Sequence, residues 1–517
     1  MQRAASNRVI SNFSPFGLWL LLFSLLNWPF YSLSEELGAV SGSDIDAPLV
    51  KDFDLLMEQA TSKSFRLGGF LKNETAYRFD EPRSFTKIRN IGMLTTDWSF
   101  GKNFRFYTAS RAYYDHVYDL FNYDTIAARQ ERSENEPLNF IEDLQKEKDS
   151  PVAEIREFYF DIFRDDMDVR IGKQFIVWGV IDGLRIVDEI NPLDFRELIL
   201  LDLLDYRIPL WSFRSSYYHN ANTLEMVWIP ELTFHKPAPP GSEWELFQVL
   251  DRTNEPQGFD PGNPGSFNPR LSEYGIRFIT SIFDAELSFS YFYTWDDYPT
   301  AFRVISNQGV RALAPDEEPA ILPTYTRLGI LGSTLVKEFK GDILRAEMAY
   351  VTGKYFAISN ADRDGDGFLD YDGEVKRDHF RWALGYDFNL RGLDVSPSIA
   401  QWIIRDYDDQ FLVDEYDTTF NLFLRKPLRK ISATFSYLLI YFINFDETYS
   451  RPRFSFNITD HFQVEAGLDL FVGSRTQFGR GRSENPLVGG VDIEQRAQFV
   501  GNFKDNRRVF VNFKYTF

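Results

Sequence analysis

The last eleven residues, Arg507 to Phe517, alternate between two kinds of side chain. Every second position is apolar and the series ends in aromatics: Val509, Val511, Phe513, Tyr515, Phe517. The positions between are polar, with Phe510 as the exception: Arg508, Asn512, Lys514, Thr516. Period-two alternation predicts a β-strand with one apolar and one polar face. Such a strand suits a wall between lipid and a polar lumen, and it also suits the half-buried edge of a soluble sheet.

The same alternation recurs from residue 64 onward, for example in 284–295 and 462–472. These segments have about the 10 residues that a tilted strand needs to cross a bilayer. We predict an even number of strands, as single-chain bacterial barrels require. The eighteen predicted strands are 64–79, 88–99, 103–116, 154–163, 167–177, 209–218, 222–232, 271–282, 284–295, 323–338, 342–355, 379–389, 392–405, 414–425, 430–444, 450–459, 461–473 and 507–517.

The connections between these strands alternate in length. The short ones are 100–102, 164–166, 219–221, 339–341 and 390–391. The long ones are 117–153, 178–208, 233–270, 296–322, 356–378 and 474–506. Short periplasmic turns and long extracellular loops are typical of outer-membrane barrels. The sequence therefore predicts an all-β fold, a transmembrane antiparallel up-and-down β-barrel of about 18 strands, with both termini periplasmic.

The N-terminus has the features of an export signal. Arg3 and Arg8 precede a short apolar run at 16–26, and small residues follow it. This order predicts a secretory signal peptide at 1–34, although a single membrane anchor is the alternative. Residues 35–63 are then a periplasmic segment whose stretch 49–62 forms a short amphipathic helix or a linker. The barrel occupies 64–517, and we expect it in the outer membrane of a Gram-negative bacterium.

Composition excludes several classes of function. The chain has no cysteine, so it cannot form disulfides, thiolate metal sites or covalently bound c-type haem. A net charge of -20 argues against nucleic-acid binding, which needs a basic face. The five histidines lie in no recognisable catalytic or metal-binding motif. We therefore expect no enzyme, no haem and no nucleotide cofactor.

One group of motifs carries a family resemblance. The residues are Arg170, Gly172 and Gln174, then Trp178 and Gly179, then Asn191, Pro192 and Asp194, and finally Pro209. This R-x-G-x-Q, W-G and N-P-x-D series resembles a large proteobacterial outer-membrane family without an agreed activity. The resemblance implies genes near RND-type exporters of lipids or hydrophobic molecules, and hence a periplasmic shuttle or inner-membrane exporter as partner. Val180 and Ile181 follow W-G where that family usually has an acid. The architecture is also similar to that of alginate-export porins, which have 18 strands.

The connection at 178–208 is the candidate site. Asn191 and Pro192 predict a helix start, and the helix expected at 193–206 is unusually apolar. An apolar loop is costly in water, so it either plugs the barrel or lines a path for a hydrophobic substrate. The candidate substrate-path residues are Arg170, Gln174, Trp178, Asn191, Asp194, Leu198 and Leu201.

A second motif predicts a metal site. Asp362, Asp364, Asp366, Gly367 and Asp370 match the first part of an EF-hand-type calcium loop. Gly373 replaces the usual final glutamate, and Asp372 or Glu374 could substitute for it. We expect a structural calcium ion in this extracellular loop, and an acidic solvated loop is the alternative. The candidate ligands are Asp362, Asp364, Asp366, Phe368, Asp370, Asp372 and Glu374.

Charged residues of both signs occupy the predicted inward positions, which indicates charge-paired walls. The candidates are Arg66, Lys72, Glu74, Arg170, Glu286, Arg345, Glu347, Arg381, Asp387, Arg453, Glu465, Asp469 and Lys514. We expect a channel or transporter for a small hydrophobic or amphipathic molecule, embedded in outer-membrane lipid and working with periplasmic partners. A general diffusion porin and a structural barrel that holds a partner protein, such as an electron-transfer protein, are the alternatives.

Overall fold

The computed structural model describes the greater part of the chain after residue 63. The described residues are 64–81, 83–117, 152–181, 183–200, 203–236, 244, 271–298, 300–303, 321–358, 374–408, 411, 413–474 and 500–517. The predicted signal peptide and periplasmic segment lie outside them and stay predictions. Among these residues, no helix has the length and apolar character needed to cross a membrane.

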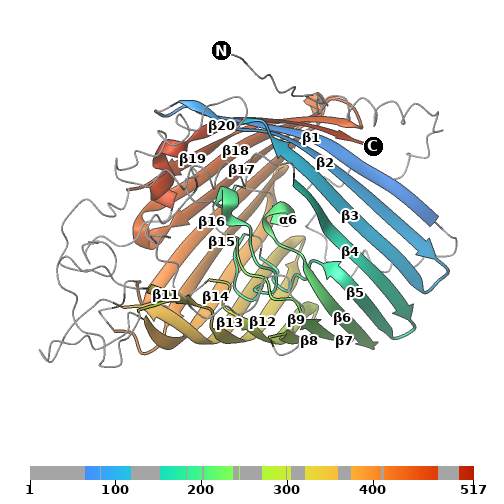
Figure 1. Cartoon of the computed structure of the whole chain (residues 1–517), viewed down its shortest axis with the longest axis vertical. Coiled ribbons are helices and arrows are strands. Elements are labelled where there is room, and N and C mark those ends of the chain that lie inside the picture. Colours follow the sequence, from blue (N-terminus) through green and yellow to red (C-terminus); the bar gives the residue numbers. More distant parts are fainter. Residues whose placement is uncertain are drawn as a thin grey trace, which may run out of the picture. The chain divides into compact units, whose positions relative to one another are not determined.

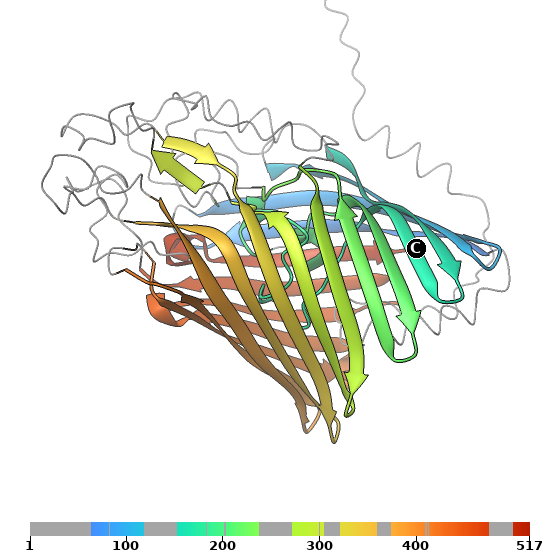
Figure 2. The same cartoon turned by 90° about the horizontal axis from the view of Figure 1, so that it is seen from below.

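Eighteen strands form one closed antiparallel sheet (Figures 1 and 2). β1 pairs with β20, which closes the barrel, and Gly69 and Phe517 exchange two backbone hydrogen bonds of 3.0 Å at the end of this pair. The strands are β1 Ser64–Arg78, β2 Ser84–Phe100, β3 Phe104–Asp115, β4 Val152–Arg164, β5 Met167–Gln174, β6 Leu210–His219, β7 Asn222–Ile229, β8 Glu273–Ile282, β9 Ala285–Trp295, β12 Arg327–Phe339, β13 Asp342–Ala357, β14 Glu374–Leu390, β15 Leu393–Ile404, β16 Tyr416–Leu428, β17 Ala433–Phe442, β18 Glu447–Asn457, β19 Phe462–Val472 and β20 Arg508–Thr516.

The predicted fold class is confirmed, and each predicted strand corresponds to a strand of the barrel. The ends differ by a few residues; for example, β14 begins at Glu374 rather than at 379. Tight turns join the strands at one end of the barrel, which we call the short-turn rim. Turn residues there adopt positive φ, as at Asn220 (53°) and Gly341 (95°). The longer connections leave the other end, which we call the long-loop rim.

The strands divide their side chains between the two sides of the wall. On β20, Val509, Phe513 and Tyr515 face outward with 38–46% of their surface exposed, whereas Arg508 faces the lumen and is 3% exposed. The outward positions of the other strands carry large apolar side chains in the same way, including Trp98, Ile276, Leu331 and Met348. The barrel therefore has an apolar exterior, whereas many of its lumen-facing positions carry polar or charged side chains.

Several short elements complete the described structure. β10 (Thr300–Arg303) and β11 (Ile321–Thr324) form a separate two-stranded sheet in the β9–β12 connection (Figure 2). The 3₁₀ helices are η1 Phe195–Glu197, η3 Arg429–Ile431, η4 Ile443–Phe445 and η5 Val500–Asn506, and the α-helix is α6 Leu203–Tyr206.

The continuous helix predicted at 193–206 is wrong. Leu198 has φ 53° and ends η1, so among the described residues of this stretch only α6 is α-helical. Asp194, rather than Asn191, caps η1 by accepting the N–H of Arg196. The backbone on either side instead forms isolated β-bridges, from Leu193 to Arg207 and from Asp194 to Lys236. The short helix predicted for this connection is therefore present, and its described part has four residues.

Candidate functional site

The connection from β5 to β6 folds into the barrel (Figure 1). We call residues 175–209 the inserted segment; 182, 201 and 202 lie outside the described residues. Gly172 lies just before it, with φ 138°, where an added Cβ would stand 2.1 Å from the Phe158 carbonyl oxygen. Only glycine fits this close approach. The glycine of the R-x-G-x-Q motif therefore lets β5 lie against β4 as the chain turns inward.

The first part of the inserted segment packs on one side of the barrel through apolar side chains. Six of its residues join a buried cluster: Ile176, Trp178, Ile181, Ile186, Val187 and Ile190. The wall contributes residues of β6, β7, β9 and β12–β15: Leu210, Val227, Ile229, Phe292, Leu328, Ile330, Ala349, Val351, Ala383 and Ala400. Gly275 of β8 makes room for Trp178, whose ring would lie 2.6 Å from an added Cβ. Small wall residues thus accommodate the large side chains of the segment.

Two buried carboxylates of the wall hold the backbone and the indole of this part. Glu347 of β13 accepts the N–H groups of Val180 (2.5 Å), Ile181 (2.7 Å) and Val187 (3.3 Å). Glu225 of β7 accepts the indole N–H of Trp178 at 2.5 Å. A carboxylate that accepts several hydrogen bonds offsets the cost of its burial. Val180 and Ile181, which follow W-G, therefore do contact an acidic residue, but that residue is Glu347 of β13 rather than a neighbour in the sequence.

Charged contacts fix the middle of the inserted segment. Glu189 pairs with Arg381 of β14 and with Arg185, 3.3 Å away. Burial opposes ionisation of Glu189, but the two guanidinium groups outweigh it and lower the pKa of Glu189 to about 2. Asn191 accepts the N–H of Ile176 and donates to the carbonyl of Ile208, both at 2.8 Å. The N-P-x-D motif therefore ties the two ends of the segment together.

The later part of the inserted segment reaches the opposite side of the barrel. Glu197 forms ion pairs with Lys87 and Arg89 of β2, and Asp205 lies 2.7 Å from Arg111 of β3. Although burial opposes ionisation of Glu197, the basic neighbours hold its pKa well below the usual range. Arg451 of β18 donates to the Leu200 carbonyl at 2.8 Å. The segment thus touches opposite walls of the lumen.

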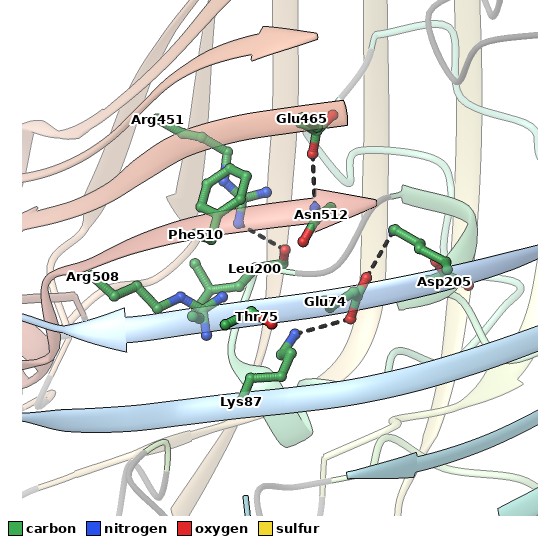
Figure 3. Close-up of a pocket in the computed structure, with 12 residues that line it drawn as sticks. Glu74, Thr75, Lys87, Leu200, Asp205, Arg451, Glu465, Arg508, Phe510 and Asn512 are labelled. Carbon is green, nitrogen blue, oxygen red and sulfur yellow. Dashed lines mark hydrogen bonds and ion pairs between the residues drawn. The ribbon is translucent and has the colours of Figure 1, made fainter. Parts of the chain in front are cut away.

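A narrow polar space lies between the segment and this second side (Figure 3). Its volume is about 40 Å³, which is room for a few water molecules. Its lining mixes both signs of charge: Lys72, Glu74, Thr75, Ala76, Lys87, Leu200, Asp205, Arg451, Glu465, Arg508, Phe510 and Asn512. This space is too small for an organic solute while the segment stays in place.

The predicted substrate-path residues that the structure describes are engaged in packing and pairing. Arg170 pairs with Asp161 at 2.6 Å, and Gln174 donates to the Ser212 carbonyl. Trp178 and Asn191 are 1% exposed, Asp194 and Leu198 are 3% exposed, and Leu198 packs with Leu200, Tyr449 and Phe471. Leu201 lies outside the described residues. Whether any of these side chains contacts a substrate stays a prediction.

Of the predicted calcium ligands, Glu374 at the start of β14 is described, and Asp362, Asp364, Asp366, Phe368, Asp370 and Asp372 lie outside the described residues. Within the described part, no group of three or more His, Asp or Glu residues could hold a metal ion. The calcium site therefore stays a prediction.

The charge-paired walls expected from the sequence are present. Arg345 and Asp387 lie 2.7 Å apart, and Arg453 and Glu465 lie 3.4 Å apart. Alternation put Glu347 and Arg381 in the lumen, but it could not reveal that they hold residues 180–189, which are far away in sequence. Glu197 was not a candidate, and its burial between two basic residues leaves no signal in a linear pattern.

Comparison with known proteins shows the family of this chain and the solved structures to which its fold is similar. No curated relative matches the sequence. The chain is similar in fold to Acinetobacter baumannii OccAB2 (9% identity, TM-score 0.44, 88% of this chain and 98% of that one). Pseudomonas aeruginosa OccK2 (OpdF), solved in complex with glucuronate, is 8% identical, with a TM-score of 0.44. The match covers 88% of this chain and 97% of that one. Vibrio cholerae OmpT is 8% identical, with a TM-score of 0.39, and the match covers 88% of this chain and 100% of that one. The model of the family described as "Protein of unknown function (DUF1302)" matches residues 78–517, so the chain belongs to that family.

Proposed function

We propose that this chain is an outer-membrane channel closed by its inserted segment, which passes a small amphipathic solute when the segment moves. The observation that carries the proposal is the contact of one segment with opposite walls of the lumen; the space described between the segment and its second side has a volume of about 40 Å³. A barrel that served only as a scaffold would need no such closure. The closed state described here is then the resting state.

The outward face of the barrel supports a place in a membrane. Large apolar side chains such as Phe65, Leu331 and Met348 are more than half exposed, and a water-soluble surface rarely carries such a continuous apolar band. A closed barrel satisfies every backbone hydrogen bond within lipid, because it has no open edge. With the short turns periplasmic, Phe517 would lie at the periplasmic rim.

The lining of the narrow space favours a solute with polar groups. The large apolar side chains that the structure describes at 176–190 are buried against the wall, and Leu198 and Leu200 are buried with Tyr449 and Phe471, so packing accounts for these apolar residues. The groups that border the space are mainly charged, with basic residues such as Lys72 and Arg508 beside Glu74. The proposed solute is therefore amphipathic rather than wholly hydrophobic. A periplasmic shuttle or RND-type exporter as partner remains a proposal that rests on the sequence resemblance alone.

Conductance in planar bilayers tests the closure. Glu347→Gln removes the carboxylate that accepts three backbone N–H groups. We expect several-fold more open-channel conductance from this variant than from the wild type. Glu286→Gln is the matched control, because Glu286 lies on β9 and interacts with Arg277 of the neighbouring strand. Equal conductance of Glu347→Gln and the wild type would contradict the proposal.

A reversible lock separates movement of the segment from general damage. The Cβ of Val187 lies 3.3 Å from a Cβ added at Gly332, near the spacing of about 3.8 Å found in disulfides. The cysteine-free chain provides a clean background. Glu347→Gln combined with Val187→Cys and Gly332→Cys should conduct poorly when oxidised and well when reduced. A diffusion porin would conduct well in the wild type, and a partner-holding barrel would conduct in neither state.

A further inference from the structure

A second cavity lies at the long-loop end of β13–β16, apart from the narrow space beside the inserted segment. Its volume is about 310 Å³, which is at the lower end of the range of small-molecule sites. The wall includes aromatic side chains, among them Trp402, His379 and Phe356. Their rings pack together, with centroids 5.6 Å apart for His379 and Trp402 and 5.5 Å apart for His379 and Phe356. The cavity is therefore partly apolar and of a size for a small organic molecule.

The lining of this cavity contains more carboxylates than basic groups. Four carboxylates and one ammonium group line it. Lys354 already pairs with Asp296 at 2.5 Å, and Asp414 accepts from the Asn444 amide at 2.8 Å. In the described part of the chain, Asp417 has a buried Oδ1 without a hydrogen-bond partner. An unpaired buried carboxylate oxygen is costly, and a cationic ligand would provide its missing partner.

His379 provides a second group that points to a ligand. Its ring is fully buried, and Nε2 accepts the Nε–H of Arg381 at 2.8 Å. Arginine can only donate, so the proton of the neutral imidazole is assigned to Nδ1. Among the described residues, this Nδ1 has no partner. Two residues of the cavity wall therefore carry buried polar atoms without a partner among the described residues, an acceptor oxygen on Asp417 and a donor nitrogen on His379.

We infer that this cavity binds a small organic amine, with its ammonium group on Asp417 and its apolar body along the aromatic wall. An acceptor oxygen on the ligand, such as a hydroxyl, would take the proton of His379 Nδ1. His379 accepts from Arg381, which pairs with Glu189 of the inserted segment, so two contacts link the cavity wall to the closure. The inference rests on the proposed function only in naming this amine as the class of solute that the channel passes.

Binding of three matched probes to the full-length barrel in detergent tests the site. Benzylamine is the cation, benzyl alcohol its neutral counterpart and benzoate the anion. Saturation-transfer NMR should show saturable binding of benzylamine and none of the other two. Asp417→Asn should weaken benzylamine binding by about tenfold or more. Asp97→Asn, which removes a carboxylate that pairs with Arg105 at 2.9 Å on distant strands, should leave binding unchanged.

Equal binding of benzylamine and benzyl alcohol, or equal binding to the wild type and Asp417→Asn, would overturn the inference. If Asp417→Asn does not form a heat-modifiable barrel, the comparison of the three probes on the wild type decides the question alone. The measurement does not involve conduction, so its failure would leave the channel proposal standing. Failure of the conductance tests would likewise leave a demonstrated amine site in place.

Discussion

The two sides of the lumen hold the inserted segment in different ways. The β6–β15 side buries residues 176–190 in an apolar cluster and binds their backbone through Glu347. The β1–β3 side holds Glu197 and Asp205 through ion pairs, next to the space in Figure 3. Apolar burial is insensitive to salt, whereas an ion pair weakens as salt rises, and it weakens less the more it is buried. Leu198 and Leu200 also pack with Tyr449 and Phe471 on the second side. The difference is therefore one of degree, with the larger apolar anchor on the β6–β15 side.

Removal of the anchor should have the largest effect. Trp178→Ala deletes a fully buried indole and leaves Glu225 without its N–H donor. We expect docking of the segment to weaken by about 3–5 kcal/mol, which should give a channel that stays open. The measurements are single-channel conductance and thermal unfolding.

Trp211→Ala is the control for this change, because Trp211 faces outward from β6 and is 42% exposed. It should leave conductance near that of the wild type. A Trp178→Ala barrel that remains as closed as the wild type would reverse the comparison and place the anchor on the charged side.

A change on the charged side should have a smaller effect. Glu197→Gln removes the negative charge that pairs with Lys87 and Arg89. Both basic residues still have Glu74 as an ion-pair partner, at 3.3 Å and 4.0 Å. We expect a loss of about 1–3 kcal/mol and brief openings, which should become more frequent as salt is raised. Recordings at low and high ionic strength check this. Long, salt-independent openings would show that the charged side is an anchor too.

Acid should weaken the middle of the segment only at low pH. The pKa of Glu189 falls from 4.5 to about 2 on docking, so its contribution is complete above pH 4.5 and is lost as pH falls toward 2. The contribution of Glu189 to closure should therefore be unchanged above about pH 5 and be lost only below that range. A titration of open probability against pH in the wild type and in Glu189→Gln checks this. The same acid response in both proteins would contradict the assignment.

The smallest effect is expected from the predicted calcium loop. It joins β13 and β14, the strands that carry Glu347 and Arg381. If residues 362–374 bind calcium, chelation should lower the melting temperature by about 2–4 °C and leave the closure intact. Asp364→Asn should remove this response. Identical melting with and without calcium, at millimolar concentration, would eliminate the site.

The sequence determined the barrel far better than it determined the site. Alternation along β9 and β20 reports directly which face meets lipid, because the side-chain period of a strand is two. Prediction of the 193–206 helix failed because apolar content alone cannot distinguish a helix from a coil that is packed on both sides. The positive φ of Leu198 and the bridges of Leu193 and Asp194 depend on contacts that only the closed barrel creates.

The cavity lined by His379 and Asp417 could not be predicted from the sequence for the same reason. His379 and Asp417 belong to different strands, and nothing in either strand indicates that one lacks a donor and the other an acceptor. By contrast, the steric demand at Gly172 is local to one strand pair, because an added Cβ would meet the backbone of Phe158 on β4. Local demands leave a pattern in the sequence, whereas pairing across the lumen does not.

The reach of the segment's contacts also has a consequence for the order of assembly. Val180 and Glu347 are 167 residues apart, and Leu200 and Arg451 are 251 apart. The β5–β6 hairpin can form as soon as its own residues are available. The wall residues that hold the inserted segment are in place only after β13, β14 and β18 have joined the sheet. Contacts of such long range are slow to form. The segment therefore cannot be held in the lumen before most of the wall has been built, so closure of the pore depends on nearly the whole barrel.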